Sequence, residues 1–208
     1  MIDEINLPLI LAAAFLGAAS SGPATLTIAG VSMNSGRRKG LALASGVTSV
    51  SLMWSISAAF GLGALMLANA WAFEVVRYLG AGYLLFLAYK SARSALTPFS
   101  TKAHGIAVQS VRAAYTKGLM LHLTNPKAVL FFGSLFSIGV PSNSSIEALA
   151  MVIAAVGIQS ALIFHGYALL FSNAAITARY VKLRRWFEAV FALVFGAAGL
   201  KILTMPID

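Results

Sequence analysis

Residues 148–178 read ALAMVIAAVGIQSALIFHGYALLFSNAAITA and contain no Asp, Glu, Lys or Arg. A helix needs about 20 mostly apolar residues to cross the hydrocarbon core of a bilayer, so this stretch is long enough for one spanning helix. Three other stretches, 5–36, 40–73 and 128–146, also lack these four residue types. The sequence therefore predicts an all-α membrane protein.

The composition excludes several other classes of protein. Of the 208 residues, 59% are hydrophobic and 10% are charged, whereas a soluble domain carries about 25% charged residues. A water-soluble fold of this size cannot bury so much apolar surface, and a disordered chain would need low hydrophobicity and many charges. The chain has no cysteine, which excludes a disulfide scaffold, a thiolate metal site and CxxC redox chemistry.

Two further apolar segments, 72–94 and 184–204, carry only isolated charges. Together with the charge-free stretches they predict six transmembrane helices, at 7–31, 42–68, 72–94, 117–140, 146–171 and 184–204. The N-terminus carries Asp3 and Glu4, where a cleavable signal peptide has basic residues. We therefore expect the first segment to remain as a helix.

The basic residues predict the orientation in the membrane. Twelve of the fifteen lie in three alternate loops, after helix one, between helices three and four, and between helices five and six. Loops rich in Lys and Arg stay in the cytoplasm, so both termini are expected in the periplasm of a bacterial inner membrane. The net charge of +9 is divided among these loops, which favours contact with anionic lipid headgroups and not with nucleic acid.

The six helices divide into two repeats of three, at 1–94 and 117–208, joined by a basic cytoplasmic loop at 95–116. Each repeat has an odd number of spans, so related halves must enter the membrane from opposite sides and form an inverted repeat. Helix one is interrupted by Ser21-Gly22-Pro23 and helix four by Asn125-Pro126-Lys127. Proline breaks a helix but favours a helix start, so each break predicts a new half-helix, beginning at Pro23 and at Pro126.

The N-terminus of a half-helix attracts anions, so two of them near the midplane would suit a carboxylate. Each break alone is equally typical of a kink that eases packing, but their matched placement favours a binding site. Lys127 adds to this, because an ionisable residue inside the membrane indicates function. It lies about 15 Å along helix four, at 1.5 Å per residue, too deep for the alternative, in which it extends to the cytoplasmic interface.

Helix two carries Ser51 on one face with Thr48 and Ser55. Small hydroxyl residues favour helix–helix contacts, and a substrate-binding role for Ser51 is the alternative. Trp54 lies in the middle of the same span, where lining a cavity and packing in the core are equally expected.

Two histidines lie within predicted helices. His122 shares a helix face with Asn125, and His165 lies in helix five with Gln159, a candidate substrate-binding residue. Either histidine could accept protons in coupled transport, although a hydrogen-bonded packing role is favoured. Glu188 has Arg184 four residues before it, a spacing that favours a structural pair.

The sequence shows no motif for chemical catalysis. There is no phosphate-binding loop, no GxSxG elbow and no HExxH helix, so we expect neither an enzyme nor a bound cofactor. Three histidines without a cysteine are also a weak basis for a metal site. Gly196 and Gly199 in the last helix suit either a contact in a homodimer or a contact within the chain.

These motifs together resemble the lysine exporter (LysE/RhtB) family of amino-acid exporters. The matching segments are the Gly22-Pro23 of helix one, the basic loop 36–40 with 41–46 after it, LGAGYL at 79–84, and Asn125-Pro126-Lys127 followed by FF at 131–132. The resemblance implies export of amino acids or close derivatives, driven by an ion gradient. It points to Gly22, Pro23, Asn125, Pro126 and Lys127 as substrate-binding residues.

The chain departs from the family pattern at three places. It reads Ser-Gly-Pro-Ala at 21–24 where relatives often read PGPN, it has no acidic residue near Ser51, and it lacks the PQF that commonly follows the FF. The expected function is a secondary amino-acid exporter that works by alternating access. The alternatives are an exporter of another small solute or metal ion with this architecture, and a non-transport subunit of a membrane assembly.

Overall fold

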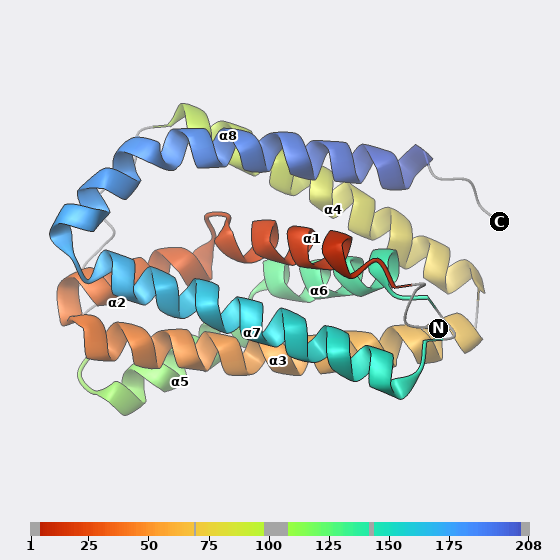
Figure 1. Cartoon of the computed structure of the whole chain (residues 1–208), viewed down its shortest axis with the longest axis horizontal. Helices are drawn as coiled ribbons and strands as arrows, with labels where there is room; N and C mark the ends of the chain where they lie inside the picture. The colour runs from red at the N-terminus through yellow and green to blue at the C-terminus, as the bar shows by residue number, and fades with distance from the viewer. Residues whose placement is uncertain (1–4, 69, 98–107, 142–143, 205–208) are drawn as a thin grey trace.

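The fold consists of helices. The computed structural model describes residues 5–68, 70–97, 108–141 and 144–204, and within these ranges it contains eight helices and no strand (Figure 1). In chain order they are α1 (Leu7–Ala19), α2 (Pro23–Ser35), α3 (Arg37–Ala68), α4 (Ala70–Leu96), α5 (Val111–Leu123), α6 (Pro126–Gly139), α7 (Ile146–Phe171) and α8 (Ala174–Thr204).

The two predicted helix breaks are present. The first predicted segment is the pair α1 and α2, which meet at an angle of 52°, and the fourth is the pair α5 and α6. Both α2 and α6 begin at a proline, Pro23 and Pro126, because proline is preorganised for the first position of a helix. The chain therefore does not run through either proline as a continuous rod.

Three helices begin before their predicted bounds, in the basic loops: α3, α8, and α5, which begins at Val111 and not at 117. Helix α3 begins at Arg37, directly after Gly36, whose φ of 84° ends α2. Helix α8 begins at Ala174, where the side chain of Asn173 accepts hydrogen bonds from the N–H groups of Ala175 and Ile176. The prediction located only the apolar part of each helix, because Lys and Arg end the apolar segment but are good helix formers.

By length and hydropathy, two described helices could cross a membrane, Arg37–Gly61 within α3 and Ile146–Phe171, which is α7. The bent pair of α1 and α2 would add a third if it is one span. The other predicted spans are divided or carry charges; the apolar part of α6, for instance, covers only Lys127–Phe136.

The helices form two long pairs with short helices between them. Helix α4 packs along α8, and α3 packs against both α5 and α7. Figure 1 shows α1 and α6 in the middle, between the α4–α8 pair and the α3–α7 pair. Apolar side chains from α1, α6 and α7 form the largest buried cluster, which includes Ile10, Phe132, Phe136 and Val152.

Glycines allow the closest helix contacts. A Cβ at Gly46 of α3 or at Gly118 of α5 would overlap backbone atoms of the other helix, so these helices cross with their backbones in contact. On α8, a Cβ at Gly199 would lie 2.9 Å from Leu85 Cγ, and one at Gly196 would lie 3.8 Å from Ala88 Cβ. The two glycines of the last helix therefore serve a contact within the chain, with α4.

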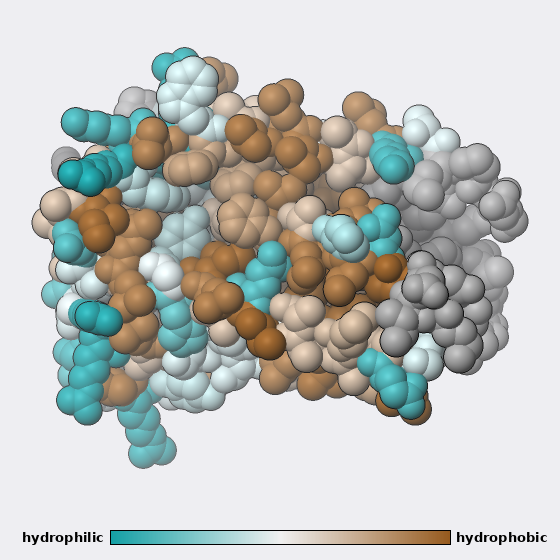
Figure 2. Space-filling view, viewed as in Figure 1, coloured by the Kyte–Doolittle hydropathy of each residue, from teal (hydrophilic) through white to brown (hydrophobic). Residues whose placement is uncertain are grey.

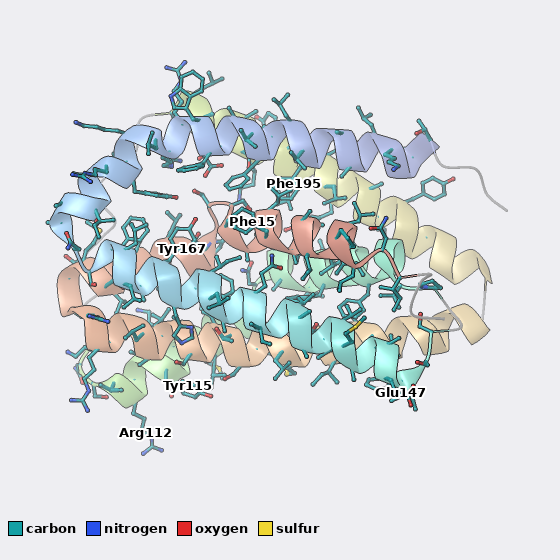
Figure 3. All side chains as sticks on the ribbon, in the orientation of Figure 1. Phe15, Arg112, Tyr115, Glu147, Tyr167 and Phe195 are labelled. Atoms are coloured by element: carbon teal, nitrogen blue, oxygen red, sulfur yellow. The ribbon has the colours of Figure 1, made fainter. Side chains whose placement is uncertain are left out.

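The basic segments gather at one end of the molecule. Lys39 Nζ donates to the carbonyl of Val108 over 2.7 Å, which joins the first basic segment to the second. The guanidinium of Arg184 donates to Ser94 Oγ and to the carbonyl of Thr97, which joins the third to the end of α4. Figure 2 shows many hydrophilic side chains at the left end and a largely hydrophobic middle. Arg112 lies toward that end and Glu147 toward the other (Figure 3).

Candidate functional site

The first break joins α1 to α2 through an extended segment in the interior. The carbonyl end of α1 is followed by Ser20, which is buried and extended, with φ −70° and ψ 146°. Gly22 precedes α2; its N–H donates to Thr25 Oγ1 over 2.8 Å, and the Thr25 hydroxyl donates to the Gly22 carbonyl over 3.0 Å. This reciprocal pair satisfies a donor at the start of α2 that the helix itself leaves unpaired.

The second break is capped by a side chain. Asn125 is the N-cap of α6, and its Oδ1 accepts a hydrogen bond of 3.1 Å from the N–H of Lys127. Asn125 is only 5% exposed, so the carboxamide lies inside the protein. Asn directly before Pro is a favoured way to start a helix, so the local sequence explains this cap.

Lys127 connects the two breaks. Its Nζ donates to Ser20 Oγ over 2.6 Å and to the Ser20 carbonyl over 3.2 Å. An ammonium at the start of α6 needs compensation, because the positive end of the helix dipole lies there. The end of α1 supplies it, because the last carbonyls of a helix carry partial negative charge.

Gly22 lies against the same lysine. A Cβ at position 22 would be 3.3 Å from both Cδ and Nζ of Lys127. The backbone at Gly22 is extended, with φ −158°, so the glycine is needed for space and not for its conformation. The glycine thus allows the lysine to approach the first break closely.

A small cavity lies where the breaks meet. It encloses about 40 Å³, which suffices for roughly one to three water molecules, whereas pockets for small molecules have about 300–1,000 Å³. Its polar lining comes from both breaks and from α3, α5 and α7, namely Ser20, Gly22, Thr25, Ser51, His122, Asn125, Lys127 and Ser160. Five predicted site residues therefore line one cavity: Gly22, Ser51, His122, Asn125 and Lys127.

His122 has one free ring nitrogen at this cavity. Its Nε2 lies 3.0 Å from Ser51 Oγ, and the Ser51 hydroxyl donates to the Val47 carbonyl over 3.1 Å. A hydroxyl has a single proton, so this chain of bonds assigns a proton to Nε2 and leaves Nδ1 as an acceptor. Nδ1 is buried and has no hydrogen-bond partner among the described residues, and the side chain is 5% exposed.

Three other predicted residues make contacts outside the cavity lining. Trp54 packs against the largest apolar cluster. Gln159 Nε2 donates to the Leu11 carbonyl over 3.0 Å, which ties α7 to α1. His165 has both ring nitrogens in contact, Nε2 with Ser45 Oγ at 3.0 Å and Nδ1 with the Ala161 carbonyl at 2.8 Å. These contacts fit packing and helix pairing.

Pro23 and Pro126 begin α2 and α6, so they set the direction of the two half-helices. Pro23 is exposed. Its role at the break is therefore one of backbone geometry.

Sequence reasoning did not single out Tyr167 of α7. Its hydroxyl donates to the Ala19 carbonyl at the end of α1 over 2.6 Å, and Figure 3 shows it beside the loop between α1 and α2. A tyrosine deep in an apolar helix is a weak signal, because its ring alone would explain its burial. Only the partner of the hydroxyl, 148 residues away, connects it to the break.

A larger cavity of about 680 Å³ lies between α1, α7 and α8. Its walls are mainly apolar, with Phe15, Leu162 and Phe187 among them. Its polar lining is limited to Tyr167, Arg179 and Tyr180, whereas polar groups of both breaks line the smaller cavity, so the smaller cavity is the better candidate for a zwitterion. Among the described residues, no three His, Cys, Asp or Glu side chains cluster closely enough to hold a metal ion.

Comparison with known proteins supports a transport role. The model of the LysE type translocator family matches residues 15–206. The threonine efflux protein of Escherichia coli (strain K12) is 25% identical over 186 residues, which cover 88% of this chain and 90% of that protein. A leucine efflux protein of Klebsiella pneumoniae is 30% identical over 188 residues, with 88% of each chain covered. No solved structure matches the chain.

Proposed function

The chain belongs to the LysE type translocator family, and on this basis we propose that it exports an amino acid or a close derivative across the bacterial inner membrane. The curated names of its relatives refer to threonine and leucine efflux, which supports a small amino acid as the substrate class. The site of transport in this proposal is the small polar cavity between the two helix breaks.

The observation that carries the proposal is the contact between the two breaks. Lys127 of α6 reaches Ser20 at the end of α1 with two hydrogen bonds. Broken helices inside a membrane are tolerated where they face protein or a watery cavity, and in secondary transporters they typically form the substrate site. A break used only for packing would not need an ammonium from the other half of the chain.

The site suits a zwitterion. The N-termini of α2 and α6 and the C-termini of α1 and α5 all lie at the breaks. In our proposal the substrate carboxylate binds Lys127 and the start of α6, where the helix dipole is positive. The α-ammonium binds the Ser20 carbonyl and Nδ1 of His122, which are acceptors.

Lys127 then changes partner during binding. In the structure its ammonium donates to the carbonyl and the hydroxyl of Ser20. In our proposal the substrate ammonium takes the place of the lysine at Ser20. An incoming carboxylate would draw the lysine away, and the substrate ammonium would replace it at Ser20. This exchange keeps every charged group paired, which a low-dielectric interior requires.

The proposal includes six spans in two inverted repeats, at 1–94 and 117–208, linked by the basic loop. The pattern of helix contacts supports it, because α3 packs against its counterpart α7, and α4 against its counterpart α8. The contact of α2 with α7 corresponds to that of α6 with α3 in the other half. The contact of α1 with α6 corresponds in the same way to that of α5 with α2. A twofold relation between the halves would produce such matched contacts.

The size of the cavity supports alternating access as the proposed mechanism. At about 40 Å³ it cannot hold an amino acid, so the halves must move apart on one side to admit the substrate. One contact is not matched between the halves. Helix α4 packs against α6, but their counterparts α8 and α2 are not among the helix pairs in substantial contact in the described structure. Unequal halves are what rocking of one repeat against the other requires.

The proposed orientation has the basic end in the cytoplasm and both termini in the periplasm. Its support is the gathering of the three basic segments at one end, through the contacts of Lys39 and Arg184. The positive-inside rule then assigns that end to the cytoplasm.

The test is exchange of labelled substrate in proteoliposomes that contain the purified protein. Vesicles loaded with unlabelled amino acid take up the labelled form only if a carrier exchanges the two. The panel comprises threonine, leucine and other amino acids, together with the 2-hydroxy acid and the amine that each lack one charge. We expect uptake of at least one amino acid and little uptake of either single-charge analogue.

Lys127→Met is the decisive variant, and Lys182→Met, at an exposed position of α8, is its matched control. Loss of charge-assisted hydrogen bonds costs about 1.5–3 kcal/mol each, so we expect exchange by Lys127→Met to fall by at least about 10-fold. Lys182→Met should exchange as the wild type does. Absence of exchange across the panel, or equal rates for Lys127→Met and the wild type, would contradict the proposal.

A further inference from the structure

Glu188 is a buried carboxylate in the middle of α8. It is 2% exposed and is among the largest fully buried side chains of the described structure. Its Oε2 has no hydrogen-bond partner among the described residues. Within the predicted span 184–204 it lies four residues, or about 6 Å at 1.5 Å per residue, from the end that adjoins the basic segment of α8. A buried carboxylate with an unpartnered oxygen is costly, so its presence here indicates function.

The helix contacts place Glu188 level with the carbonyl end of α1. One turn along α8, Phe191 packs in a cluster with Ala19, the last residue of α1. Tyr167 reaches the carbonyl of the same Ala19. Ser20, the next residue, holds the Lys127 ammonium, so the acid and the lysine approach the first break from different helices.

The charges around Glu188 are few and largely positive. The carboxylate attracts the Lys127 ammonium of α6, and Tyr167 of α7 and Tyr180 of α8 also lie within its electrostatic reach. Arg184 lies one turn before Glu188 on α8, and Lys90 of α4, the helix that packs along α8, acts on Lys127. Lys127 is thus the cation that links Glu188 to the cavity.

We propose that Glu188 is the proton-binding residue through which an ion gradient drives export. This rests on the proposed function. In the deprotonated state its negative charge stabilises a cation at Ser20, either the Lys127 ammonium or the α-ammonium of the substrate. A proton on the carboxylate removes that stabilisation, so proton and substrate compete for the protein.

Competition of this kind gives antiport. The protein releases its substrate when a proton binds from the outer side, and it binds the next substrate when the proton leaves to the inner side. Linkage makes the effect reciprocal, so the substrate must lower the proton affinity of Glu188 by the same factor. No bond other than that of the carboxyl proton forms or breaks.

The test compares two measurements on the same proteoliposomes, with and without a pH gradient. Substrate exchange at equal pH tests the proposed function, and acceleration of transport by the gradient tests Glu188. We expect Glu188→Gln, which mimics the protonated acid, to exchange substrate with a raised KM and to lose at least 10-fold of the acceleration by the gradient. Glu147→Gln, at an exposed position of α7, should respond to the gradient as the wild type does.

A second measurement does not depend on the folding of a variant. In the wild type, proton competition should raise the KM of exchange as the pH falls, and Glu188→Gln should show a KM that no longer changes with pH. A wild-type response of Glu188→Gln to the gradient would overturn the proposal, as would a KM of the wild type that is independent of pH. A folded Glu188→Gln protein that keeps the KM of the wild type at high pH would overturn it too, because loss of the negative charge should weaken substrate binding.

Discussion

Substitution of Gly118 by Ala should both destabilise the protein and impair transport. Gly118 lies where α5 crosses α3, and an added Cβ would overlap the backbone of Leu43 and approach the N of Val47 to 3.2 Å. Backbone atoms on both sides cannot turn away as a side chain can, so the two helices must separate. Overpacking of this kind typically costs about 1–3 kcal/mol.

The same separation reaches the candidate site. His122 follows Gly118 by one helical turn, and its Nε2 is held 3.0 Å from Ser51 on α3. A displacement of roughly 1 Å would lengthen this contact beyond about 3.6 Å, where it ceases to be a hydrogen bond. A misplacement of about 1 Å can reduce a rate about 100-fold, so we expect a loss of exchange larger than the loss of stability alone would give.

Thermal unfolding of the purified protein in detergent, followed by intrinsic fluorescence, measures the first effect. For a chain of this length about 1 kcal/mol corresponds to a change of about 2–4 °C, so the Tm should fall by about 2–12 °C. Gly82→Ala is the control, because a Cβ there meets nothing within 4 Å, and alanine is the better helix former by about 1 kcal/mol. If Gly118→Ala proved as stable and as active as Gly82→Ala, the close crossing of α3 and α5 would be refuted.

Three further substitutions test single contacts. Asn125→Ala removes the cap of α6 and should cost about 1 kcal/mol, a loss that Asn125→Asp should largely avoid in thermal unfolding. Tyr167→Phe removes the bond to the end of α1 and should lower the free energy of unfolding by about 1 kcal/mol; an unchanged Tm would contradict that contact. Gly36→Ala forces a side chain into the left-handed region at φ 84° and should cost about 1–2 kcal/mol, whereas Gly61→Ala, in open space, should cost nothing measurable in the same assay.

The helix breaks and their caps could be predicted because their causes are local. Proline removes a backbone donor wherever it occurs, and Asn before it caps the next helix. Both effects need only a few consecutive residues, so residues 21–23 and 125–127 were sufficient to predict the two breaks. The helix ends in the basic segments could not be located in this way, because charge marks the edge of the apolar core and not the end of a helix.

The partners of the polar side chains could not be predicted, because they lie far apart in the sequence. Lys127 was a candidate from its depth in the membrane, but its partner Ser20 is 107 residues away. Gln159 and His165 were also candidates, and they hydrogen-bond Leu11 and Ser45. A polar group in a membrane interior needs a partner in either role, so its residue type alone does not distinguish a site from a packing contact.

The spacing of residues along α8 did not predict the surroundings of Glu188 either. The interval of four residues indicates a local pair with Arg184, whose guanidinium donates to Ser94 and Thr97 at the end of α4. The burial of the carboxylate and its relation to Lys127 depend on how α8 packs on the rest of the chain. Such tertiary effects have no signature in a single sequence.

The small volume of the space between the breaks bears on how well the cell keeps the voltage across its membrane. A pore that stayed open even briefly would let protons run across the membrane and dissipate the voltage, which is worth about 2.3 kcal/mol per charge for every 100 mV. With the Lys127 ammonium bound to Ser20, the space between the breaks is about 40 Å³, too little for a continuous file of water there. An idle copy of the protein would thus be electrically silent, so a bacterium could keep many copies in its membrane without a standing leak.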